Sequence, residues 1–90
     1  MAKVYYVDGV VEDIQPKNGK DFKLEELRDI VEGWIEILYL NDGRLMVINE
    51  EGKLEGLDLN VNATNIYMES FENNDIIVGN ALVCDKNEIE

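Results

Sequence analysis

The sequence has 90 residues, of which 46% are hydrophobic, and this suits a single ordered domain. Its 20 acidic and 8 basic residues give a net charge of −12, which repels phosphates and anionic lipids and excludes direct, non-specific binding to nucleic acid or membrane. One cysteine excludes an internal disulfide, and no apolar run approaches the ~20 residues that span a bilayer or resembles a signal peptide, so we expect a cytoplasmic protein.

The first third of the chain predicts a hairpin followed by a helix. Residues 3–7 and 10–14 have strand composition, and Asp8 with Gly9 forms a good two-residue turn between them. From Leu24 the apolar residues recur at helical spacing, which indicates a helix that ends near a glycine cap at Gly33. The apolar face of this helix, expected in the core, consists of Leu24, Leu27, Ile30, Val31 and Trp34.

The middle third predicts three strands. Residues 34–40 and 44–49 flank Asn41, Asp42 and Gly43, which are the strongest hairpin signal in the sequence. A tight turn at Glu51 and Gly52 then leads to a weaker strand over residues 53–57.

The last third predicts a helix and a buried strand. Asn60 or Asn62 can cap a helix over residues 63–71, and the β-branched segment 76–83 fits a central strand that is buried on both faces. The element order is therefore β-β-α-β-β-β-α-β, and residues 1–90 form one acidic α+β domain. Because hairpins dominate, we expect a mainly antiparallel sheet with both helices packed on one face.

The residue inventory excludes most catalytic and metal chemistry. There is no histidine, and Ser70 and Thr64 are the only serine and threonine, so one chain cannot build a Ser-His-Asp or Cys-His arrangement. Zinc and iron–sulfur sites need several Cys or His ligands, and the acids lack the spacing of a calcium-binding EF-hand loop. Cys84 ends an apolar segment and is expected to be a small buried hydrophobe. We expect no enzymatic activity, no metal and no cofactor.

Polar residues around one turn are the best candidates for binding. Asn49, Glu50, Glu51 and Lys53 have no obvious structural need, although stabilisation of the turn is the alternative interpretation. Asn60, which also suits a helix cap, and Thr64 complete the candidate binding set.

A set of short motifs runs through residues 24–83 in a fixed order. They are Leu27, residues 30–36, residues 49–54, Gly56 with Leu57, Asn60, Ala63 with Thr64, Asp75, residues 77–79, and Leu82 with Val83. By these motifs the chain resembles a family of short uncharacterised proteins common in phages and mobile elements of gut bacteria. Many relatives have a proline and an arginine where this chain has Asp58 and Val61. The resemblance implies a mobile-element context, in the cytoplasm of a bacterial host cell, and brings no established activity.

Three functions are open at this point. The first is a non-enzymatic phage or mobile-element accessory protein that binds and blocks a basic host protein, such as a defence factor, because its carboxylates imitate a phosphate array. The second is an oligomeric sponge that traps a nucleotide signal, for which Arg28, Arg44 and the lysines are the available cations. The third is a structural or regulatory module without a ligand. A homo-oligomer is expected in each case, since a small core favours a shared interface.

Overall fold

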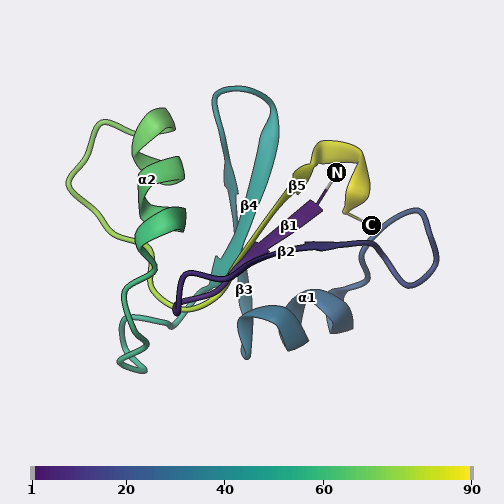
Figure 1. Cartoon of the computed structure of the whole chain (residues 1–90), viewed down its shortest axis with the longest axis horizontal. Helices are drawn as coiled ribbons and strands as arrows, with labels where there is room; N and C mark the ends of the chain where they lie inside the picture. The colour runs from purple at the N-terminus through teal and green to yellow at the C-terminus, as the bar shows by residue number, and fades with distance from the viewer. Residues whose placement is uncertain (1, 90) are drawn as a thin grey trace.

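Two hairpins and one late strand build a single five-stranded sheet in the computed structural model, which describes residues 2–89 (Figure 1). In chain order the elements are β1 (Ala2–Tyr5), β2 (Val11–Ile14), α1 (Leu24–Val31), β3 (Ile35–Tyr39), β4 (Arg44–Asn49), α2 (Val61–Ser70), β5 (Ala81–Asp85) and the short 3₁₀ helix η1 (Lys86–Glu88). The strands lie in the order β2-β1-β5-β4-β3, and every neighbouring pair is antiparallel. The α+β class and the antiparallel sheet predicted from the sequence are confirmed.

The same aspartate-glycine device closes both hairpins. Gly9 and Gly43 have φ angles of 93° and 91°, which glycine adopts without strain. In each turn the aspartate before the glycine accepts a hydrogen bond from the backbone N–H two residues further on, so that Asp8 Oδ1 caps Val10 and Asp42 Oδ1 caps Arg44, both at 3.0 Å. Both hairpins were predicted from these residues.

The core has two layers, one on each face of the sheet. Side chains alternate along β4 and β5, so Leu45 and Leu82 pack with α1 on one face, whereas Met46 and Val83 pack with α2 on the other. Figure 1 shows the two helices on opposite sides of the strands. The prediction that both helices pack on one face was therefore wrong. Its physical reason is that the central strands are apolar on both faces, and each face needs its own cover.

Two predicted strands differ in extent. Residues 53–57 form turns instead of a strand, because their backbone bonds locally, as in Glu55 N to Glu51 O at 2.9 Å and Leu57 N to Gly52 O at 3.0 Å. The central strand begins at Ala81 and not at residue 76, because Gly79 takes a φ of 79° and turns the chain before it enters the sheet.

No helix within residues 2–89 is long and apolar enough to cross a membrane.

The single cysteine packs inside the core. Cys84 is fully buried in the layer under α1. Burial is the main cause that raises the pKa of its thiol to about 12, and the nearby carboxylates of Glu88 and Asp85 contribute less. The thiol is therefore protonated at neutral pH and packs as the small hydrophobe that was predicted.

Candidate functional site

The predicted binding residues lie at two places in the fold. Asn49 ends β4, and Glu50, Glu51 and Lys53 belong to the turns over residues 50–56. Asn60 and Thr64 lie at the start of α2. The structure thus brings the first four together and separates them from the other two.

Asn60 is fully buried and ties three segments together. Its Oδ1 accepts the hydrogen bond from Ala63 N at 3.0 Å, which caps α2. Its Nδ2 donates to the carbonyls of Tyr5 and Gly79, each at 2.8 Å. Because both polar atoms of the amide bond within the protein, Asn60 positions the start of α2 against β1 and the turn before β5.

Thr64 has a similar internal role one turn further along α2. Its Oγ1 accepts a hydrogen bond from Ile77 N at 2.9 Å and lies 3.3 Å from Ile77 O, to which it donates. The hydroxyl therefore holds the segment before β5 against α2. Asn60 and Thr64 shape the fold from inside, and neither presents a polar group at the surface.

Asn49 fixes the turns that carry the other candidates. Its Nδ2 donates to Val31 O and to a carboxylate oxygen of Glu55, both at 3.1 Å, and its Oδ1 accepts from Glu51 N at 2.8 Å. A Cβ at Gly33 would lie 2.6 Å from the Asn49 Nδ2, so this glycine leaves room for the amide. Asn49 therefore joins the end of α1 to the turns after β4.

Trp34 was expected in the core, and the structure places it at the surface. The helix ends at Val31, and Glu32, with a φ of 62°, takes the left-handed cap conformation that had been assigned to Gly33. The helical spacing therefore stops before Trp34, whose side chain is 55% exposed. The guanidinium of Arg28 lies over the indole ring, 4.0 Å from its centroid.

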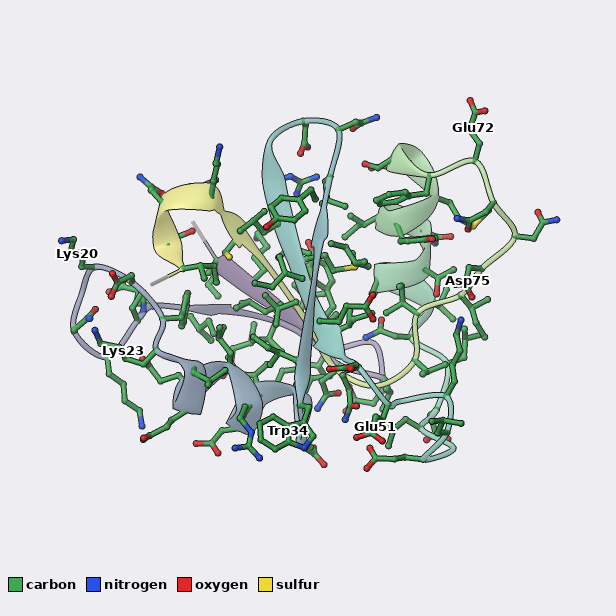
Figure 2. All side chains as sticks on the ribbon, turned by 180° about the vertical axis from the view of Figure 1, so that it is seen from behind. Lys20, Lys23, Trp34, Glu51, Glu72 and Asp75 are labelled. Atoms are coloured by element: carbon green, nitrogen blue, oxygen red, sulfur yellow. The ribbon has the colours of Figure 1, made fainter. Side chains whose placement is uncertain are left out.

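Acidic residues lie next to this tryptophan. Glu50 N donates to Trp34 O at 2.8 Å, and Figure 2 shows Trp34 and Glu51 at the same lower border of the molecule. Within residues 2–89, the carboxylates of Glu36, Glu50 and Glu51 form no hydrogen bond or ion pair. We call Trp34, Glu36, Glu50 and Glu51 the acidic edge.

A cavity of about 210 Å³ opens beside the acidic edge, on the face of the sheet that α2 covers. Leu38, Ile48 and Ile77 give it an apolar lining, and the carboxylates of Glu36 and Glu50 also line it. Glu36 lies opposite Ile48 in the pairing of β3 with β4, and Glu50 follows Ile48 by two residues, so these three side chains share one face. The cavity therefore combines an apolar lining with two acidic groups.

An ion pair closes one side of this cavity. Lys53 Nζ bonds to the carboxylate of Asp75, and this joins the turns after β4 to the segment before β5. The hydrogen bond from Lys53, followed by that from Ile76 N, holds the pKa of Asp75 below its usual range. Lys53 therefore has an intramolecular partner and serves as part of the cavity wall.

Sequence reasoning found part of this site and missed the rest. Glu50, Glu51 and Lys53 were found because they follow a strand at a turn. Trp34, Glu36 and Asp75 were missed. For Trp34 a signal existed, since Gly33 marks the end of the helix and the residue after it leaves the apolar face. Asp75 was noted only as a motif residue, and nothing local indicated its pairing with Lys53, which is 22 residues away.

Among residues 2–89, no three carboxylate or thiol groups converge in a way that could hold a metal ion.

Comparison with known proteins identifies a family but no activity. No curated protein and no solved structure shows significant similarity to the chain. The sequence model of one family, described as "Domain of unknown function (DUF3846)", matches residues 3–90, which is almost the whole length. The chain therefore belongs to the DUF3846 family.

Proposed function

We propose that this protein is a non-enzymatic binding module that docks onto a basic surface of another protein through the acidic edge. The observation that carries the proposal is a half-exposed tryptophan beside carboxylates that have no partner within residues 2–89. Tryptophan is among the residues that most often anchor protein interfaces, and unpaired carboxylates steer a basic partner toward it. The net charge of −12 extends the same attraction over the whole molecule.

The acidic edge is also held in shape before any partner arrives. Asn49 bonds to the end of α1 and to the backbone of Glu51, and Trp34 O bonds to Glu50 N. The residues of the acidic edge come from the start of β3, from Trp34 just before it and from the turns after β4, and these segments are held together by the same hydrogen bonds. Preorganisation of this kind lowers the entropy cost of association.

The cellular role that we propose is that of a phage or mobile-element accessory protein in the cytoplasm of a bacterial host cell. There it binds and blocks a host factor, and a defence protein with a nucleic-acid-binding cleft is the target that suits the chemistry best. The support is the resemblance of the motifs between Leu27 and Val83, together with carboxylates that take the place of phosphates in a basic cleft.

A nucleotide sponge has less support within one chain. The cavity beside the acidic edge, at about 210 Å³, is smaller than the roughly 300–1,000 Å³ of typical small-molecule sites. The larger surface hollows that contain Arg44 and Arg28, of about 620 and 590 Å³, are each lined by two or three carboxylates as well, which repel phosphate. Phosphate binding needs cations, yet Lys53 bonds to Asp75 and Arg28 stacks on Trp34. A protein partner therefore agrees better with the charges of the site than a nucleotide does. A module without any ligand remains the outcome if no partner binds.

The test substitutes Trp34 and Glu51, two residues of the acidic edge. Tagged protein is incubated with host-cell lysate, captured proteins are identified by mass spectrometry, and the affinity of each purified candidate is measured by titration at low and high salt. We expect a basic partner whose affinity falls at least about tenfold between 50 and 300 mM salt. Trp34→Ala is expected to weaken binding about 30-fold, the effect of an interface anchor of about 2 kcal/mol. Glu51→Gln is expected to weaken it a few-fold.

Glu72→Gln provides the matched control for Glu51→Gln. It removes the same charge from an exposed position that Figure 2 shows at the opposite border of the molecule, and it is expected to leave the affinity within twofold. An affinity that does not change with salt concentration, or that Trp34→Ala leaves unchanged, would contradict the proposal.

We further propose that a second copy of the chain pairs with strand β3. Both β2 and β3 are edges of the sheet, but β2 is short and carries Glu12 and Asp13, whereas β3 has a single charged residue among its five. Leu40 N bonds to Arg44 O, so the alternation of the ladder turns the N–H of Tyr39 outward, away from β4. An open, largely apolar edge of this kind favours strand pairing.

Tyr39→Pro tests this pairing because it removes an outward N–H and leaves the β3–β4 ladder its donors. Native mass spectrometry of the unmodified protein is expected to show a dimer, and Tyr39→Pro to shift it to a monomer, while Tyr39→Phe stays dimeric. A wild-type protein that is monomeric at tens of micromolar would show that strand β3 is not an interface between copies.

A further inference from the structure

The cavity beside the acidic edge has the size of one long side chain. Its volume is about 210 Å³, and its lining combines apolar side chains of the sheet, of α2 and of the segment before β5 with charged side chains at the exposed border. Leu38 and Ile48 are half-buried, whereas Glu36 and Glu50 are exposed. An occupant that fills it has to be apolar over part of its length and polar at its end.

The charges of the lining select a cation for that end. Four charged residues line the cavity, namely Glu36, Glu50, Lys53 and Asp75. Lys53 and Asp75 neutralise one another in an ion pair, so the lining as a whole carries two negative charges, those of Glu36 and Glu50. Within residues 2–89, neither of these two carboxylates has a cation of its own. A cation from outside would therefore gain two partners and displace none.

An arginine side chain satisfies both requirements. Its methylene stem packs on apolar surface, and its planar guanidinium presents several N–H donors, which two separate carboxylates can share. Glu36 and Glu50 are diagonal neighbours on one face of the β3–β4 ladder, since Glu36 pairs with Ile48 and Glu50 lies two residues beyond Ile48. A lysine ammonium is a more strongly hydrated point charge and would lose more water on entering.

We propose that this cavity receives an arginine side chain from the basic partner, with the guanidinium between Glu36 and Glu50 and the stem against Leu38 and Ile48. The inference rests on the proposed function, because it names the chemical group of the partner that the acidic edge recognises. It also divides the work of the site. Trp34 and Glu51 act at the outer border, and the cavity supplies specificity for arginine over other basic groups.

The experiment uses a small defined probe, a glycine-arginine-glycine tripeptide blocked at both ends. Its binding is followed by two-dimensional NMR of the isotope-labelled full chain. The backbone amides of Ile48, Lys53, Ile76 and Ile77 are expected to shift, with saturation at millimolar peptide. The same peptide with citrulline, which keeps the shape and loses the charge, is expected to leave them unmoved. The lysine peptide is expected to bind several-fold more weakly.

Variants at the cavity fix the assignment. Glu36→Gln and Glu50→Gln are each expected to weaken the arginine peptide by about fivefold or more, whereas the control Glu72→Gln leaves it within twofold. Lys53→Met removes the one cation of the lining and is expected to strengthen binding a few-fold. All four side chains are exposed, so the fold is retained, and unshifted amides elsewhere in the spectrum check this.

The outcomes separate this inference from the proposed function. Equal shifts with arginine and citrulline, or binding that Glu36→Gln and Glu50→Gln leave unchanged, would overturn the inference. If the arginine peptide fails while Trp34→Ala still weakens the partner protein, the cavity assignment is wrong and the proposed function stands. If the partner protein is also insensitive to Trp34→Ala, both are wrong.

Discussion

Replacement of Asn60 by alanine is expected to lower the free energy of unfolding by about 3–4 kcal/mol. The change removes the cap of α2, worth about 1 kcal/mol, and leaves the carbonyls of Tyr5 and Gly79 without their donor at about 1–1.5 kcal/mol each. A domain of 90 residues has roughly 5–13 kcal/mol in total, so this loss would be a large fraction of its stability. Urea unfolding followed by circular dichroism measures it.

A second substitution separates the two contributions of Asn60. Asn60→Asp keeps an oxygen that can cap Ala63 N but cannot donate to Tyr5 O or Gly79 O, and it buries a charge against both carbonyls. We expect it to be at least as destabilising as Asn60→Ala. The matched control is Asn65→Ala, an exposed position on the same helix, where we expect a change within about 0.5 kcal/mol. If Asn60→Ala costs no more than the control, the amide does not join these segments.

Asn49→Ala is expected to cost about 2–3 kcal/mol, by the loss of the donor to Val31 O and of the acceptor for Glu51 N. Its second consequence lies at the surface. The turns that carry Glu50 and Glu51 lose their attachment to the end of α1, so hydrogen exchange at Glu51 N is expected to become faster, and partner binding weaker, although Asn49 itself is buried.

Gly33→Ala tests the same contact from the other side. The added Cβ would lie 2.6 Å from the Asn49 Nδ2 and would push the amide out of position. We expect the same direction of change in stability and in Glu51 exchange as for Asn49→Ala. Gly56→Ala, at a position where the added Cβ meets no atom within 4 Å, controls for the general cost of alanine at a glycine and adds only backbone strain from its φ of 70°. Unchanged exchange at Glu51 in both Asn49→Ala and Gly33→Ala would contradict this account.

Local signals predicted the parts of the fold that local forces determine. Asp8 with Gly9 and Asp42 with Gly43 close their hairpins through bonds within a few residues, and Asn60 caps α2 through a bond to a residue three positions away. Interactions of this kind depend only on residues close together in the chain, so short sequence patterns predict them.

The features that were missed depend on residues far apart in the chain. Which face of the sheet a helix covers is decided by how the side chains of β4 and β5 alternate, and neither α1 nor α2 contains that information. Asn60 was placed both as a cap and as a binding residue because its second partner, Tyr5 O, is 55 residues away. A sequence does not show which distant carbonyl accepts the hydrogen bond of a buried amide, so such a residue is easily interpreted as a binding residue.

Trp34 shows the same limit at the site itself. Its spacing from Leu27 and Val31 matches a helical core position, and only the left-handed turn at Glu32 takes it out of the helix. That turn is set in part by Asn49, which bonds to Val31 O from the end of another strand. A contact that spans 18 residues therefore helps to place the tryptophan at the surface, together with the local helix end that Gly33 marks.

Strand β5 comes last in the chain and lies in the middle of the sheet, between β1 and β4. Each hairpin can form from neighbouring residues as soon as the ribosome releases it, but the two halves have no shared strand until residues 81–85 arrive and Val83 pairs with both Lys3 and Met46. Pairing across such a long loop carries a large closure entropy, so we expect the insertion of β5 to be the slow event in folding. Until then two half-sheets expose their inner edges, and we expect the net charge of −12 to oppose the association of unfinished copies during synthesis.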